Sequence, residues 1–269
     1  MGTLLQDKNA VIYGAGGAVG SAVARAFARE GAKVFLAGRT LEKLDGVAKE
    51  IRSAGGAVET AQVDTLVEEA VDMHMSTMVS KAGGLDISFN ATGIAGAFVA
   101  EKGLQGTHLV QMSLENFLLP IVTYTRSNFL TARASARVMV KKGSGVILMH
   151  TPEPARLGVP TIGGMGPAWA AMESLSRNLS AEYGSQGIRA ICLRSTGMPE
   201  TPTIDFVFDV QAKAMGVTRE QFQSFMEGMT HRRRSTKLEE VANAAVFAAS
   251  DLGSGLTGTV LNLTGGIVD

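Results

Sequence analysis

Short apolar runs alternate with longer amphipathic segments along nearly the whole chain. The apolar runs are bounded by glycine or polar residues and predict strands over residues 9–13, 33–37, 58–63, 85–90, 145–149, 188–193 and 259–263. The segments between them have apolar residues at helical spacing and predict helices over residues 22–29, 41–54, 66–82, 113–141, 167–183 and 238–250. Because parallel strands are joined by crossover helices, this alternation predicts an α/β fold with a doubly wound, seven-stranded parallel sheet.

One segment departs from the alternation. No linker or low-complexity tract interrupts the chain, so residues 1–269 are interpreted as a single domain with an irregular insert at residues 201–234. The insert is rich in Phe and Met, and ligand sites in such sheets lie beyond the carboxyl ends of the strands, which favours a lid over an apolar ligand. The alternative is that these side chains only pack the insert onto the body.

The charge balance narrows the class of ligand. The 25 basic and 25 acidic residues give a formal net charge of zero, which argues against a general binder of nucleic acid or of an acidic membrane. A small-molecule ligand is therefore expected. The single cysteine, Cys192, excludes a disulfide framework, and no histidines stand at metal-ligand spacing, so no metal is expected. Residues 1–8 lack the apolar core of a signal peptide, and a cytoplasmic location is expected.

Glycines cluster where the first strand turns into a helix. A turn of this kind directs backbone N–H groups and the positive end of the helix toward an anion, and so predicts a phosphate cradle. Its alternative is a purely structural turn. The residues expected to contact a dinucleotide there are Gly14, Gly16, Gly17, Val19 and Gly20.

The end of the second strand indicates which nucleotide is bound. A dinucleotide fold places an acid there for a free ribose hydroxyl, or an arginine for a 2′-phosphate. The acid is missing, and Arg39 stands 19 residues after Gly20, with Thr40 and Lys43 as candidate helpers. We therefore predict NADP(H) rather than NAD(H). The alternative is an arginine that meets only solvent.

These motifs resemble those of the short-chain dehydrogenase/reductase family. The glycine run is similar to the family's Thr-Gly-x-x-x-Gly-x-Gly, with Tyr13 for the Thr and Ala18 for the middle Gly. The resemblance extends to residue 266 and implies cofactor contacts from Asp64, Asn90, Ala91, Gly93 and Thr201. It also implies subunit contacts through the two longest helices, and hence a homotetramer, with a dimer as the alternative.

The resemblance fails at the residues that carry the family's chemistry. It implies a proton-donating Tyr, a Lys four residues later, a Ser and an Asn. Met165 and Trp169 stand at the Tyr and Lys places, Thr151 or Pro152 at the Ser place, and Tyr124 near the Asn place. Met and Trp cannot donate the proton that a reduced carbonyl oxygen requires.

Other side chains must then supply the proton if the chemistry is retained. The candidates are Tyr124, the tyrosine expected near the cleft, His150, whose ordinary pKa is near neutrality, and the adjacent Thr151. Glu153 and Arg156 on the following loop are expected to be solvated, and the alternative is that they bind a polar substrate. Trp169 is expected to fill core space, and the alternative is that it stacks against the nicotinamide.

Three functions remain open on the sequence alone. The first is an NADP(H)-dependent oxidoreductase that acts on a small, largely apolar carbonyl, enone or imine with an unusual proton donor. The second is a catalytically inactive NADP-binding sensor or partner subunit. The third is a non-redox lyase or isomerase, which would not need Arg39.

Overall fold

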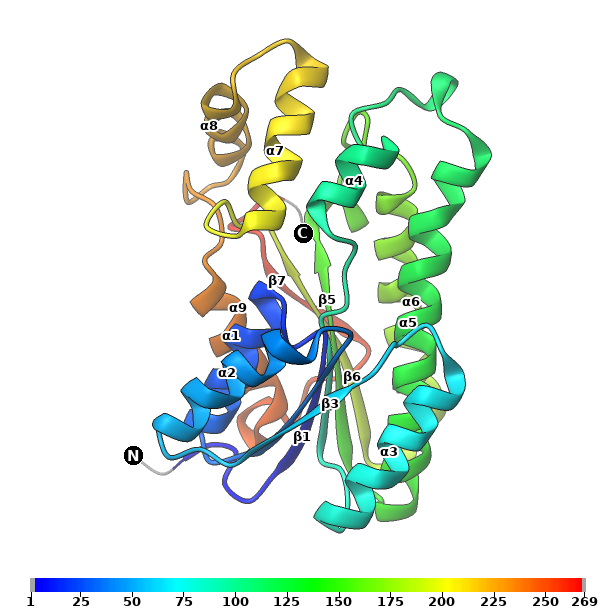
Figure 1. Cartoon of the computed structure of the whole chain (residues 1–269), viewed down its shortest axis with the longest axis vertical. Helices are drawn as coiled ribbons and strands as arrows, with labels where there is room; N and C mark the ends of the chain where they lie inside the picture. Colours follow the sequence, from blue (N-terminus) through cyan, green and yellow to red (C-terminus); the bar gives the residue numbers. More distant parts are fainter. Residues whose placement is uncertain (1–2, 268–269) are drawn as a thin grey trace.

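Residues 3–267 are described by the computed structural model, in which a seven-stranded sheet forms the centre of the molecule (Figure 1). All its strand pairs are parallel, and the order is β3-β2-β1-β4-β5-β6-β7. The strands are β1 (Asn9–Tyr13), β2 (Lys33–Gly38), β3 (Val58–Gln62), β4 (Ile87–Asn90), β5 (Gly145–Pro152), β6 (Ile188–Ser195) and β7 (Thr259–Leu263). The predicted fold class is confirmed. The order reverses between β1 and β4, and a ligand crevice is expected beyond their carboxyl ends.

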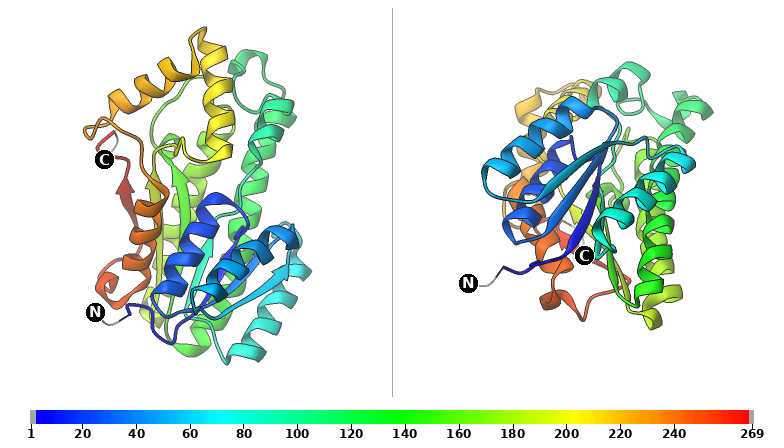
Figure 2. Two further views of the ribbon diagram at one scale, coloured as in Figure 1. Left: turned by 60° about the vertical axis from the view of Figure 1, so that its left-hand side comes forward. Right: turned by 60° about the horizontal axis from the view of Figure 1, so that its bottom comes forward.

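Helices cover both faces of the sheet (Figures 1 and 2). One face carries α1 (Ala18–Arg29), α2 (Leu41–Ser53) and α9 (Leu238–Ala249), and the other carries α3 (Glu68–Ala82), α5 (Leu114–Lys142) and α6 (Met165–Tyr183). The alternation along β2 shows why two layers form. Val34 and Leu36 are buried in one apolar cluster, and Phe35 and Ala37 are buried in the other.

Three further helices lie beyond the end of the sheet: α4 (Gly96–Lys102), α7 (Pro202–Met215) and α8 (Arg219–Met229) (Figure 1, top). The insert expected at residues 201–234 contains two regular helices, which the sequence analysis did not predict. Thr201 accepts a hydrogen bond from Ile204 N at the start of α7, and Thr218 forms a capping box with Gln221 at the start of α8. These N-terminal caps were the signal in the sequence for both helices.

Some helices and strands are longer than predicted. The first helix begins at Ala18 rather than residue 22, while β5 and β6 continue to Pro152 and Ser195. Short 3₁₀ turns cover Leu109–Gln111, Glu153–Ala155, Gly184–Gln186 and Asp251–Gly253. Within residues 3–267, none of the helices combines the length and the apolarity that crossing a membrane requires.

Candidate nucleotide and substrate site

A cavity of about 410 Å³ opens at the carboxyl ends of the central strands. It begins at the turn between β1 and α1, passes the loop after β4 and ends between β5, α6 and the helices α7 and α8. Its walls therefore combine residues that are more than 200 positions apart in the sequence, such as Gly14 and Met226.

Backbone groups form the first end of the cavity. Gly14 has φ +74°, and a Cβ there would lie 2.7 Å from the carbonyl carbon and oxygen of Ala91. A Cβ on Gly20 would lie 2.4 Å from the oxygen of Gly14. Helix α1 follows with Gly17 as its N-cap, without a side-chain cap and without an acidic residue in its first turn. This turn fits a pyrophosphate, because its free backbone donors and the helix dipole both favour an anion.

Cationic side chains stand beside this turn. Arg39 is exposed and lines the cavity together with Thr40 and Lys43, directly after β2. Within residues 3–267, Glu153 is the only acidic side chain on the cavity wall, and it lies on the loop after β5. The end near β2 thus offers a guanidinium and an ammonium to a 2′-phosphate, and no carboxylate to a ribose hydroxyl.

The structure places most of the predicted cofactor residues on the wall and some behind it. Gly20, Asp64 and Asn90 lie behind it, whereas the wall includes Gly14, Gly16, Gly17, Val19, Arg39, Ala91, Gly93 and Thr201. Asn90 Nδ2 donates to Thr131 Oγ1 (2.8 Å), and Asn90 Oδ1 accepts from Thr92 N (2.8 Å). Asn90 thereby attaches the loop after β4, which forms part of the cavity wall, to helix α5.

Tyr124 and Trp169 meet at the second end of the cavity. Their rings are 5.9 Å apart in an edge-to-face arrangement, and both line the wall. The Tyr124 oxygen accepts hydrogen bonds from Ile94 N (3.4 Å) and from the Trp169 indole. Burial raises the pKa of Tyr124, and these two hydrogen bonds oppose part of that rise. Trp169 therefore does more than fill core space, because it contacts Tyr124, a candidate proton donor.

His150 also lies on the wall, in a neutral form. Its Nε2 is 2.8 Å from Ser195 Oγ, which itself donates to the Thr196 oxygen, so Nε2 carries the hydrogen and donates to Ser195. Burial lowers the pKa of His150 to about 4. At neutral pH, His150 therefore holds no imidazolium proton to give to a substrate.

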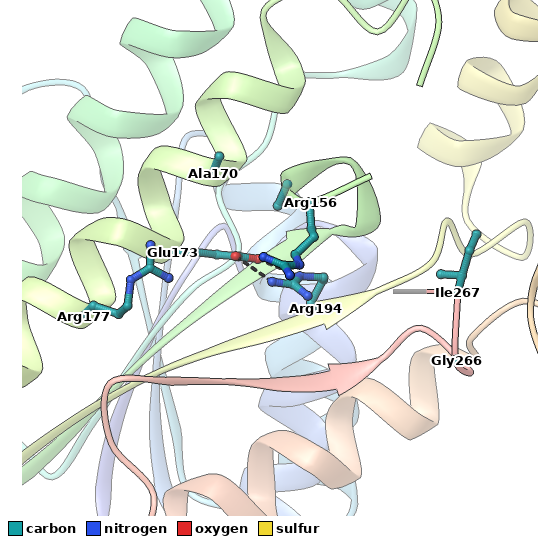
Figure 3. Close-up of a pocket in the computed structure, with 8 residues that line it drawn as sticks. Arg156, Ala170, Glu173, Arg177, Arg194, Gly266 and Ile267 are labelled. Carbon is teal, nitrogen blue, oxygen red and sulfur yellow. Dashed lines mark hydrogen bonds and ion pairs between the residues drawn. The ribbon is translucent and has the colours of Figure 1, made fainter. Parts of the chain in front are cut away.

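Thr151 does not line this cavity. Its Oγ1 donates to Glu173 Oε1 (3.0 Å), and Glu173 forms a buried ion pair with Arg194 (2.7 Å). This pair lies on a second, polar cavity of about 680 Å³ (Figure 3). Figure 3 shows Glu173 reaching from α6 toward Arg194 on β6, with Arg156 beside them and Arg177 one turn further along α6. The catalytic role of Thr151 stays a prediction that this geometry does not favour.

Glu153 was misjudged from the sequence. Only 4% of it is exposed, which contradicts the expectation that it is solvated. Its carboxyl group accepts hydrogen bonds from its own N–H and from that of Gly197, while Oε2 has no hydrogen-bond partner within residues 3–267. Burial raises the pKa of Glu153 to about 7. Pro152 and Pro154 flank it, and two restricted residues around an acid were the signal that its loop is held in place.

The helices α7 and α8 close the second end of the cavity. Phe208 and Phe222 pack edge to face at 5.2 Å, and both line the wall with Met226. The same side chains form a small apolar cluster of their own, so they pack the insert and also face the cavity. That these helices move as a lid stays a prediction.

Comparison with known proteins identifies the family. Residues 14–268 match the family model described as enoyl-(acyl carrier protein) reductase. The chain is a member of the short-chain dehydrogenase/reductase family. It is 28% identical over 264 residues to the uncharacterized oxidoreductase YxbG of Bacillus subtilis, covering 98% of this chain and 92% of that protein. Its activity class is therefore that of a short-chain oxidoreductase.

Solved structures of this family share the fold over almost the entire chain. The structure of an NAD⁺-bound xylitol dehydrogenase superposes with a TM-score of 0.90 at 22% identity, covering 97% of this chain and 99% of that one. A gluconate 5-dehydrogenase of Burkholderia cenocepacia, in complex with NADP and tartrate, superposes with a TM-score of 0.85 at 24% identity, covering 99% and 97% of the two chains. At these identities the likeness establishes the fold alone.

Proposed function

We propose that this short-chain dehydrogenase/reductase is an NADP(H)-dependent oxidoreductase that acts on a small, largely apolar carbonyl, enone or imine. One observation carries the proposal: a single cavity runs from the glycine turn and Arg39 to an apolar end at which the Tyr124 hydroxyl is held. An anion cradle and a proton donor at the two ends of one cavity are what reduction by a dinucleotide requires.

The first end supplies the groups that would hold the nucleotide. The backbone N–H groups after Gly14 would bind the pyrophosphate, and Arg39 would bind the 2′-phosphate with Lys43 beside it. When bound there, NADPH supplies hydride. The absence of acidic side chains from this end, within residues 3–267, supports NADP(H) over NAD(H).

The second end supplies the proton. The Tyr124 oxygen accepts two hydrogen bonds, and its own proton has no acceptor within residues 3–267, so the O–H can donate to a substrate oxygen. Trp169 occupies the place at which the family resemblance implies Lys. Its indole N–H is a neutral donor that stabilises the phenolate less than an ammonium group would.

Substitution of Tyr124 tests this assignment. NADPH consumption is measured at 340 nm with matched ketones, enones and imines. We expect turnover by the wild type with at least one class, and Tyr124→Phe to lower kcat with a ketone or enone by about 100-fold or more because general acid catalysis at the oxygen is lost. The NADPH dissociation constant should change less than about twofold, since the phenol lies away from the glycine turn.

Tyr183→Phe is the matched control, because this substitution removes the same hydroxyl group at the far end of α6. It should leave kcat unaltered. Full activity of Tyr124→Phe would contradict the role of Tyr124.

A second function is favoured by the residues at the family's catalytic positions. Met165 and Trp169 stand at the Tyr and Lys places and Pro152 at or beside the Ser place, which suits an NADP-binding sensor or partner subunit that has lost the chemistry. The same assay separates the two functions. Saturable NADPH binding without consumption of NADPH with any of the three substrate classes would replace the first function with the second.

A further inference from the structure

Glu153 is an acid for which the proposed reduction has no use so far. It is 96% buried, with 4% exposed, and it lines the cavity at the end of β5. Backbone N–H groups of residues 153 and 197 bind the carboxyl group, while Oε2 has no hydrogen-bond partner within residues 3–267. A buried carboxyl oxygen without a hydrogen-bond partner destabilises the folded state, so its presence calls for an explanation such as a ligand that binds it.

No cation of the described chain neutralises this carboxyl group. The other titratable side chains on the cavity wall are Arg39 and Lys43 near the glycine turn, Tyr124 on α5 and His150 on β5. His150 is neutral above about pH 4, because burial lowers its pKa. Of the charged residues near residues 153–155, Glu173 of α6 and Arg194 of β6 bind each other, and Arg156 and Arg177 line the second cavity. The pKa of Glu153 is raised by burial and is lowered by no neighbouring cation within residues 3–267.

Within the described residues, four aromatic side chains line the same cavity as Glu153, among aliphatic residues and a few neutral polar ones. Trp169, Tyr124, Phe208, Phe222 and Met226 line this end of the cavity. Aromatic faces attract cations, and a desolvated carboxylate binds a cation far more strongly than it binds a neutral ligand. A small ligand with an apolar body and one positive charge pairs with the ionised carboxylate and with the aromatic faces, whereas a neutral ketone or enone can only accept a hydrogen bond from the protonated carboxyl group.

We propose that Glu153 binds the protonated nitrogen of a small, apolar imine or amine, so that a basic nitrogen compound is the substrate class of this cavity. That such a compound is a substrate rests on the proposed oxidoreductase function; that it binds does not. With an imine, the carboxyl O–H bond breaks, its electron pair stays on the carboxylate oxygen, and the proton forms an N–H bond on the imine nitrogen. The products are an iminium ion and a carboxylate, held as a pair in the apolar cavity.

A matched pair of probes tests the proposal without nucleotide. The probes are 2-phenylpyrrolidine, a cation at neutral pH, and 2-phenyltetrahydrofuran, which has the same skeleton without the charge. Trp169 is the only tryptophan of the chain and lies on the cavity wall, so its fluorescence reports binding directly. At pH 8 we expect the amine to bind about 10- to 100-fold more tightly than the ether, the range typical of a charged hydrogen bond.

The Glu153→Gln variant keeps the shape and removes the charge. It should reduce the affinity for the amine to that for the ether and leave the affinity for the ether unchanged. Glu182→Gln makes the same change at an exposed position at the far end of α6 and should bind both probes as the wild type does. A melting curve confirms that each variant is folded.

The pH dependence gives a second readout. Since the pKa of Glu153 lies at about 7, the carboxylate that binds the amine is lost as the pH falls through 7. The amine should bind about tenfold more weakly at pH 6 than at pH 8, while the affinity for the ether stays constant.

Equal affinities of the wild type for the two probes, or unchanged amine binding in Glu153→Gln, would overturn the inference. Failure of the proposed oxidoreductase function would show itself separately, as loss of NADPH binding or of turnover while the amine still binds.

Discussion

The two ends of the cavity would, as we propose, recognise ligands by different means. At the glycine turn, recognition comes from backbone groups within a few residues of one another, and Gly14 and Gly20 are required by close backbone contacts. At the other end, recognition comes from the side chains of Tyr124, Glu153 and Trp169, which lie on three separate elements.

This difference bears on how each end tolerates changes of sequence. A backbone cradle needs only the turn and the helix N-terminus, so it survives many changes of side chain. Side-chain chemistry changes whenever one position changes, and here Met165 replaces the implied proton donor while Tyr124 brings a phenol to the cavity from a neighbouring helix. The scaffold is that of a short-chain oxidoreductase, and the end that holds Tyr124 and Glu153 is the part that we propose to be rebuilt.

The largest effect is expected from the charge at the rebuilt end. The folded protein holds the pKa of Glu153 at about 7, against 4.5 for an ordinary glutamate. The raised pKa makes its full contribution to the stability of the folded state below pH 4.5, where the carboxyl group is protonated in both states. Between pH 4.5 and 7 the carboxyl group ionises in the unfolded chain but not yet in the folded protein, and this contribution is lost. Glu153→Gln removes this loss, so its free energy of unfolding should rise relative to the wild type by on the order of 3 kcal/mol between pH 4.5 and pH 7.5.

Urea unfolding of both proteins at several pH values measures this difference. Glu182→Gln should show no such trend, because Glu182 is exposed. If the stability difference between Glu153→Gln and the wild type did not change with pH, the carboxyl group would not be held in its protonated form, and the contrast between the two ends would be weakened.

A smaller effect is expected from the contact between Trp169 and Tyr124. Trp169→Phe keeps an aromatic ring and removes the indole N–H that donates to the Tyr124 oxygen. Loss of one hydrogen bond of about 1 kcal/mol should lower kcat about fivefold and shift the alkaline limb of the kcat profile upward, since a phenolate with fewer donors is less stable.

The affinity for NADPH should not change in Trp169→Phe, because that end of the cavity is built from backbone and Arg39. A weaker NADPH complex with an unaltered kcat would assign Trp169 to nucleotide binding instead of proton donation.

The fold and the nucleotide end could be predicted from the sequence because both depend on local pattern. Strand and helix periods gave the seven strands and the flanking helices, and the spacing of Gly14, Gly20 and Arg39 marked the turn and the end of β2. Within the insert the Phe and Met residues were noted, but the two helices were not predicted, because the N-terminal caps at Thr201 and Thr218 were overlooked.

The reacting end could not be predicted to the same depth. Pro152 and Pro154 indicate that the loop of Glu153 is restricted, but its burial depends on segments far along the chain, such as the one that holds Gly197, and no local pattern reports that burial. His150 suggested an acid from its ordinary pKa, but burial by distant segments holds it neutral. The alignment of Tyr124 with Trp169 depends on how α5 packs against α6.

Calorimetric titration with NADPH and NADH tests the central claim most directly, because the proposed oxidoreductase function assumes that Arg39 and the glycine turn hold an NADP nucleotide. For the wild type, free of copurified ligand, we expect NADPH to bind at least about tenfold more tightly than NADH, and Arg39→Asp to abolish that preference by weakening the NADPH complex alone. Equal losses of affinity for both nucleotides in Arg39→Asp, or no heat with either nucleotide in the folded wild type, would contradict the account.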